Sequence, residues 1–242
     1  MSGSTDTAVV AADGAPAKVN TAPVIRAVDL IRLAQGLYFI FFGVMLASVV
    51  GAQILILLWI RTLAEVFLGI GVLAILAGTW RLRQSQLGGA WLQQTRRLLV
   101  WAGLTGYFCV LFYMWRRAPL QPYLQFNAVM FVLCGLVYLV LLAGTLRELA
   151  ACLGREDLMR EARWFGVSVT GLMLIPFGAG LIFVLVQAWR LKENALLQFQ
   201  ELVGLVNTPV LLLGLLPLSL MLGLLWATKD ATLARLQALD RG

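Results

Sequence analysis

The stretch MFVLCGLVYLVLLAGTLR, residues 130–147, decides what kind of protein this chain forms. It carries no charge before Arg147, and the uncharged run reaches back to Tyr123. An α-helix of about 20 such residues is long enough to cross the ~30 Å hydrocarbon core of a bilayer. The stretch therefore predicts a transmembrane helix, because a helix satisfies all of its backbone hydrogen bonds internally.

The composition of the whole chain extends this prediction. Of its 242 residues, 61% are hydrophobic and 13% are charged, about half the charged fraction of a soluble domain. A water-soluble globule, a disordered chain and a disulfide scaffold are thereby excluded. We predict an all-α integral membrane protein with six transmembrane helices, near residues 33–51, 53–80, 98–115, 123–146, 165–187 and 202–226.

The predicted bundle, residues 25–228, has segments of different character around it. Residues 1–24 are rich in Ala, Thr, Ser, Pro and Val without periodicity, which predicts a flexible cytoplasmic tail. Residues 229–242 carry leucines at every third position and predict a short amphipathic cytoplasmic helix. Residues 146–164 predict a further helical stretch on the same side of the membrane.

The start of the second helix can be drawn in two ways, because the chain stays apolar after Gly51. Either a turn near Gly51–Gln53 separates the first two helices, or the first helix runs to Trp59 and the second begins near Thr62. We favour the turn, since glycine is where a helix stops at the least cost.

The basic residues predict the orientation. Of the 19 Lys and Arg residues, 14 fall on the side that holds both chain ends. The positive-inside rule then places both termini in the cytoplasm. This distribution also explains the net charge of +7 without a nucleic-acid partner. The compact, leucine-rich chain predicts a bacterial inner membrane. The basic residues on the other side are Arg61, Arg116, Arg117, Arg190 and Lys192.

A short sequence recurs at the predicted cytoplasmic ends of the even-numbered spans. LAGTWR at 76–81 returns as LAGTLR at 142–147, and 225–229 reads LWATK. This pattern predicts three helical hairpins in a parallel repeat, each entering from the same side. The alternative is that small residues followed by arginine are common wherever a span reaches the cytoplasm.

Polar residues inside the predicted spans are the candidate functional residues, because such groups are costly in a bilayer. Arg61 and Glu65, one turn apart, predict an internal pair that is buried if the helix begins at Gln53 and interfacial if it begins at Thr62. We favour the interfacial pair.

The even-numbered spans carry polar groups at a similar depth near the outer leaflet. These groups either converge on a vestibule or ligand site or form interhelical hydrogen bonds, and we favour the hydrogen bonds. The candidate cluster comprises Arg61, Glu65, Gln125, Asn127, Asn207 and Thr208. Prolines that remove a backbone donor predict kinks in the last two spans, at Pro176, Pro209 and Pro217.

The inventory of reactive groups argues against catalysis. The sequence has no histidine, so no imidazole can bind haem or a metal or shuttle protons. The three cysteines are scattered and predict packing residues. No catalytic residue, cofactor or metal is expected.

We therefore expect a non-catalytic subunit that packs within a larger membrane protein assembly. Its expected partners are membrane lipids and either other membrane subunits or further copies of the chain. The alternative is a small-solute channel or secondary transporter with a polar vestibule near the outer leaflet, which the predicted kinks favour.

Overall fold

The computed structural model describes residues 26–56, 61–117, 122–171 and 216–241 of the chain. Throughout these ranges the regular elements are α-helices, as the sequence predicts. They are α1 (Ala27–Ile56), α2 (Arg61–Arg83), α3 (Gly89–Arg117), α4 (Pro122–Cys152), α5 (Glu156–Val169) and α9 (Leu216–Asp240).

Four of these helices are long and apolar enough to cross a membrane. Their apolar stretches are Ala27–Val50 in α1, Val66–Arg83 in α2, Gly89–Met114 in α3 and Met130–Cys152 in α4. The fold is thus a helical bundle compatible with a multi-pass membrane protein. The fifth and sixth predicted spans fall largely on residues 172–215, outside the described residues.

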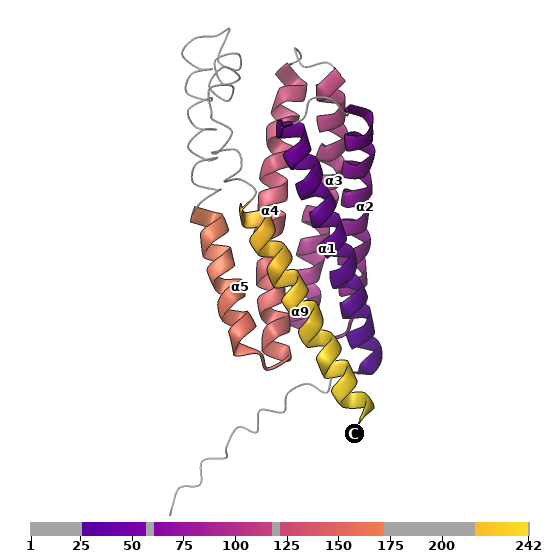
Figure 1. Cartoon of the computed structure of the whole chain (residues 1–242), viewed down its shortest axis with the longest axis vertical. Helices are drawn as coiled ribbons and strands as arrows, with labels where there is room; N and C mark the ends of the chain where they lie inside the picture. The colour runs from indigo at the N-terminus through magenta and orange to yellow at the C-terminus, as the bar shows by residue number, and fades with distance from the viewer. Residues whose placement is uncertain (1–25, 57–60, 118–121, 172–215, 242) are drawn as a thin grey trace, which may run out of the picture.

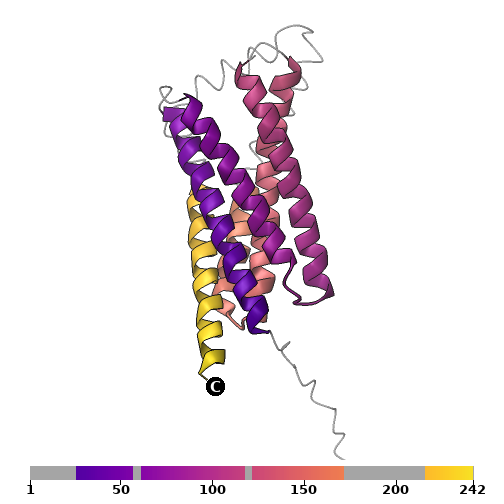
Figure 2. The same cartoon turned by 90° about the vertical axis from the view of Figure 1, so that its right-hand side faces the viewer.

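The six described helices are arranged as a ring that follows the order of the chain. Each helix packs against the next, and α9 returns to pack against α1. α1 to α4 run side by side along the long axis of the bundle, with α5 and α9 beside one part of them (Figures 1 and 2). α1 begins and α9 finishes at the same end of the bundle, which we call the terminal end.

The interior of this ring is filled mainly by one large cluster of apolar side chains, with a smaller second cluster where α4, α5 and α9 meet. α1 contributes residues at a spacing of three and four, the period that places them on one helical face. The other five described helices also contribute to the large cluster, α2 with Leu82 alone among its buried members. Because lipid tails are as apolar as leucine, such burial stabilises a membrane bundle through close packing. The largest fully buried side chains include Leu30, Leu33, Leu37, Ile40, Leu142, Leu146, Leu149, Met221 and Leu225.

Glycines bring α1 and α2 into backbone contact at two levels. A Cβ atom built on Gly78 would lie 2.6 Å from the carbonyl oxygen of Gly36, and one built on Gly43 would lie 2.6 Å from that of Gly71. Only glycine permits this approach. The sequence analysis did not single out these four residues. Their signal is the spacing of seven residues within each helix, which becomes meaningful once the two helices are paired.

The structure corrects the favoured position of the first turn. α1 continues through Gly51–Gln53 and is described as far as Ile56, and α2 begins at Arg61. The boundary therefore matches the alternative of a first helix extending to about Trp59. The physical reason is that glycine inside a helix costs only about 1 kcal/mol, less than leaving backbone groups unpaired in an apolar environment.

The predicted helix over residues 146–164 is also corrected, because a turn divides it. α4 ends at Cys152, and Gly154 adopts a φ of +70°, a left-handed conformation that favours glycine. The amide of Arg155 donates to the carbonyl of Ala150, and the amide of Gly154 donates to that of Ala151, the pattern of a Schellman cap.

Two further helix boundaries differ from the expectation. α3 begins at Gly89 rather than near residue 98, because residues 89–97 extend the span at the terminal end. Residues 229–240 are helical, and they continue α9 without a break.

Candidate functional site

The predicted polar cluster is only partly within the described residues. Arg61 and Glu65 lie in the first two turns of α2, and Gln125 lies in the first turn of α4. These three are described by their helical backbone alone. Asn207, Thr208, Pro176 and Pro209 lie outside the described residues. Helices α2 and α4 both begin at the end of the bundle opposite the terminal end (Figure 1).

Asn127 is the member of the cluster whose side chain is described. It is 4% exposed, and its Nδ2 donates to the carbonyl oxygen of Tyr123 at 2.8 Å. This bond joins consecutive turns of α4 and satisfies the buried amide locally. The predicted vestibule and the predicted interhelical hydrogen bonds both remain predictions.

Pro217 lies in the first described turn of α9 and is buried. A kink is defined by the helix on both sides of a proline. Since the residues that precede Leu216 are not described, the kink at Pro217 also remains a prediction.

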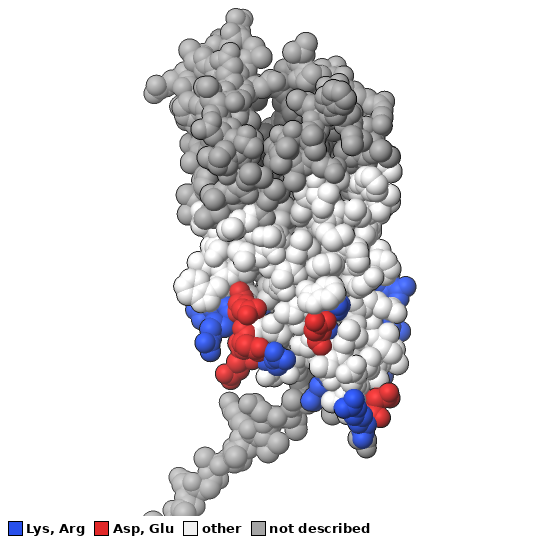
Figure 3. Space-filling model, viewed as in Figure 1, with Lys and Arg blue, Asp and Glu red and all other residues white. Residues whose placement is uncertain are grey.

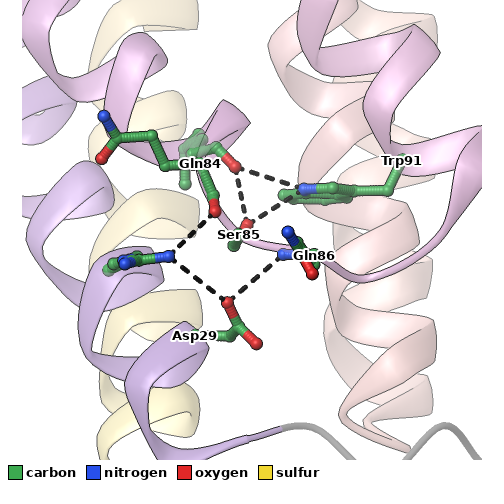
Figure 4. Close-up of polar contacts among 7 residues, drawn as sticks. Asp29, Gln84, Ser85, Gln86 and Trp91 are labelled. Atoms are coloured by element: carbon green, nitrogen blue, oxygen red, sulfur yellow. Dashed lines mark hydrogen bonds and ion pairs between the residues drawn. The ribbon is translucent and has the colours of Figure 1, made fainter.

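At the terminal end, the structure joins polar residues that the sequence analysis did not connect. The loop after α2 packs on α1 through Asp29, whose carboxylate accepts a hydrogen bond from the amide of Gln86 at 3.3 Å. Arg32 lies 4.0 Å from Asp29 and donates to the carbonyl of Gln84 at 3.2 Å (Figure 4). Asp29 is 6% exposed, so the loop and Arg32 satisfy a buried carboxylate.

The same loop is joined to α3 by a second set of hydrogen bonds. The indole Nε1 of Trp91 donates to the carbonyl of Leu82 at 3.2 Å and to Ser85 Oγ at 3.1 Å (Figure 4). Ser85 itself donates to the carbonyl of Leu82 at 2.6 Å. In the last turn of α2, just before the loop, Arg81 donates to Gln35 Oε1 at 2.7 Å and ties α2 to α1. These contacts fix the loop between α2 and α3 against both α1 and α3.

The repeated threonines form a second group of buried polar side chains. Thr79, Thr145 and Thr228 are all fully buried. Each donates its hydroxyl hydrogen to the carbonyl four residues earlier, at 2.7–2.9 Å. A threonine in any helix can make this bond to the preceding turn, so the shared bond does not test the repeat. The arrangement of three hairpins in a repeat remains a prediction.

Thr79 also braces two helices that are not neighbours in the ring. Its oxygen lies 3.1 Å from the hydroxyl of Tyr138 in α4. Because the single hydroxyl hydrogen of Thr79 is already directed at the carbonyl of Ile75, Tyr138 acts as the donor. The bond thus links the first helical hairpin to the second inside the apolar core.

Among the side chains that the structure describes, the charged ones visible in Figure 3 lie at the terminal end, below an apolar surface. The strongest ion pair there closes the turn between α4 and α5. Arg155 donates from Nε to Oδ1 of Asp157 at 3.0 Å and from Nη2 to Oδ2 at 2.6 Å. This hydrogen bonding lowers the pKa of Asp157 to about 2 and raises the pKa of Arg155. Both side chains are exposed, so the pair shapes the turn rather than forming a reactive site.

The described residues contain no cluster of three side chains able to hold a metal ion. The three cysteines are free thiols, with Cys109 and Cys134 buried and Cys152 half-buried. The buried polar side chains that the structure describes are hydrogen-bonded within the chain, mostly to backbone carbonyls.

Comparison with known protein families, with curated proteins and with solved structures finds no match for this chain.

Proposed function

We propose that the chain is an integral membrane protein that acts as a non-catalytic subunit, packing within a larger membrane assembly. Four apolar helices suggest the membrane location. In this proposal the chain crosses a bacterial inner membrane six times, as three hairpins, with the terminal end in the cytoplasm. The charges at the terminal end support the orientation, since basic residues are enriched on the cytoplasmic side.

One observation carries the structural role. Every buried polar or charged side chain among the described residues makes a hydrogen bond within the chain. A transport path or an active site needs polar groups that remain free to bind a solute or substrate. The buried polar side chains here are instead satisfied within the chain, most of them by a carbonyl of their own helix. They are Asp29, Thr79, Ser85, Thr95, Asn127, Thr145, Thr228 and Thr232.

The outer surface of α2 and α3 is the proposed contact with partner subunits. Buried residues make up 22% of the apolar stretch of α2 and 17% of that of α3, compared with 44% in α1 and in α4. Large apolar side chains cover this surface, which we call the α2–α3 face. It includes Val66, Phe67, Ile70 and Leu73 in α2, and Val100, Leu104, Tyr107, Val110 and Met114 in α3.

The test is photocrosslinking in the native membrane. A photoreactive residue in place of Tyr107, which is 57% exposed, should form adducts with another polypeptide. The same residue in place of Leu220, on the exposed side of α9, is the matched control and should label mainly lipid. Extraction in mild detergent should give stable co-migration with that polypeptide.

Lipid adducts alone at Tyr107, together with a protein that purifies by itself and carries solutes across liposome membranes, would contradict the proposal. That outcome would favour the channel or transporter alternative, for which the polar cluster around Asn127 is the candidate path.

A further inference from the structure

Three exposed tryptophans stand near the charged region of the terminal end, on different helices. Trp80 in α2 is 51% exposed, Trp164 in α5 is 68% exposed and Trp226 in α9 is 47% exposed. Tryptophan prefers the membrane–water interface, where its ring meets lipid headgroups. The surroundings of the three rings differ, and this difference indicates what each can bind.

In α2 and α9 the ring is already paired with a cation of its own helix. The guanidinium carbon of Arg83 lies 5.6 Å from the centre of the Trp80 ring. The Nζ atom of Lys229 lies 3.2 Å from the centre of the Trp226 ring, and it also pairs with Asp230 at 3.2 Å. These cations and rings are therefore already engaged within the chain.

α5 leaves its tryptophan and its two nearest arginines without such partners. Among the described residues, Trp164 has no ring or cation contact, and Arg160 and Arg163 make no ion pair or side-chain hydrogen bond. All three are exposed. Of the acidic residues nearby, Asp157 binds Arg155, and among the described residues Glu156 and Glu161 form no ion pair with either arginine.

The faces of α5 explain why these residues point outward. Leu158, Ala162, Phe165 and Val169 are buried and recur at the helical period. The opposite face carries Arg160, then Arg163 with Trp164, and then Val167, which is 62% exposed. α5 packs against α4 and α9 and lies at the outside of the described bundle (Figure 1). Along this face the chemistry passes from cation to indole to aliphatic, as a phospholipid passes from headgroup to acyl chain.

We propose that the outer face of α5 binds an anionic phospholipid, with its phosphate between Arg160 and Arg163 and an acyl chain along Trp164 and Val167. Guanidinium groups bind phosphate oxygens in paired hydrogen bonds. Basic residues beside a membrane attract anionic lipids, and the attraction weakens with salt. The site rests on the membrane location proposed above, but not on the presence of a partner subunit.

The experiment measures lipid retention by the purified, delipidated chain in detergent. Phosphatidylglycerol and phosphatidylcholine are titrated, and bound lipid is counted by native mass spectrometry. The double variant R160Q/R163Q should bind phosphatidylglycerol about tenfold more weakly at low salt, with phosphatidylcholine binding unchanged. Trp164→Ala should weaken binding of both lipids, because it removes the surface for the acyl chain.

The matched control is R235Q/R241Q, which removes the same charge from exposed positions at the terminal end. It should change phosphatidylglycerol affinity less than about twofold. R160K/R163K keeps the charge and should lose at most about threefold, which tests the site even where the double glutamine variant is poorly recovered. An equal loss in the control, or no loss in R160Q/R163Q, would overturn the site in favour of a diffuse field.

Inorganic phosphate provides the last arm of the test. At the same concentration it should not raise the melting temperature of the protein, whereas phosphatidylglycerol should. Stabilisation by free phosphate alone would overturn the lipid site. Co-migration with partner subunits is measured separately, so loss of the lipid site and failure of the subunit proposal are distinguishable.

Discussion

Helices α1 and α4 bury 44% of their apolar stretches, whereas α2 and α3 bury 22% and 17% of theirs. We call the first two the inner helices and the other two the outer helices. The apolar stretches of the inner pair have mean hydropathies of 2.0 and 2.1, and those of the outer pair 1.5 and 1.4. The inner helices are thus the more apolar, although the outer helices expose the larger share of their residues. Because lipid is as apolar as the protein interior, hydropathy selects helices that cross the membrane without setting which of them lie inside.

The more buried helices α1 and α4 each make a specific close contact with α2. α1 meets α2 through glycine pairs, and α4 meets α2 through the hydrogen bond between Tyr138 and Thr79. α3 has open space around Gly103, where a Cβ atom would meet nothing within 4 Å. The comparison therefore predicts large effects of substitution at the contacts of α1 and α4, and small effects on the outer surface of α2 and α3.

The largest expected effect is that of Gly78→Ala at the seam between α1 and α2. The added Cβ atom would meet the backbone oxygen of Gly36, which cannot move aside as a flexible side chain does. We expect a loss of about 3 kcal/mol in the free energy of unfolding, measured by denaturation in detergent. Gly103→Ala adds the same atom to open space and should be neutral or slightly stabilising. Equal melting behaviour of the two variants would show that the seam is not closely packed.

Leu142→Ala should have the next largest effect, because this side chain is fully buried in α4. We expect a loss of about 2 kcal/mol, at the lower end of the range for leucine in soluble cores, since burial from lipid contributes packing alone. The control is Leu73→Ala on the outer surface of α2, where the side chain is 66% exposed. A loss at Leu73 as large as at Leu142 would mean that another helix covers the α2–α3 face.

Tyr138→Phe removes the hydroxyl that bridges α4 to Thr79 and leaves the ring in place. We expect a loss of about 1 kcal/mol, typical of a hydrogen bond between membrane helices. Tyr107→Phe on the exposed side of α3 should change stability by less than about 0.3 kcal/mol. Unfolding curves that coincide for wild type and Tyr138→Phe would argue against the brace.

The smallest effect on stability is expected away from helices α1 to α3, at the exposed turn between α4 and α5. The pKa of Asp157 is lowered to about 2 by its hydrogen bonds from Arg155, from an ordinary value of about 3.9. The contribution of Asp157 to stability is therefore complete above about pH 4 and is lost as the pH falls towards 2. Asp157→Asn should flatten the dependence of melting temperature on pH within that window. A dependence as steep in Asp157→Asn as in the wild type would exclude the pair as its source.

Much of the fold could be predicted from the sequence, because long uncharged runs can only form helices in a bilayer. The predicted end of the second helix at Trp80, the end of the third at Trp115 and the start of the fourth at Tyr123 lie within three residues of the observed boundaries, whereas the starts of the second and third helices were wrong. The end of α1 could not be predicted, since Gly51 is equally compatible with a turn and with a helix that continues. The break at Gly154 was missed because the residues on both sides of it favour helix.

The candidate polar residues were harder to predict, because a sequence does not say which partner satisfies a polar group. Asn127 was expected at a vestibule or in an interhelical hydrogen bond, and both expectations remain predictions, because its described amide binds the carbonyl of Tyr123 on its own helix. Gln35, which the sequence analysis did not connect to any partner, accepts a hydrogen bond from Arg81 of the next helix. The pairing of helices supplies this information, and it depends on glycine contacts that carry no polar signal.

The contact between α1 and α9 has a consequence for biosynthesis. In the order of translation, α9 is the last of the six described helices to leave the ribosome, and the side of α1 that it covers stays uncovered until then. If the chain is inserted into a membrane as proposed, that side faces lipid or an insertion chaperone until then. A ribosome that stalls before residue 216 would therefore leave an unfinished bundle with an open flank, a form that membrane quality control can recognise.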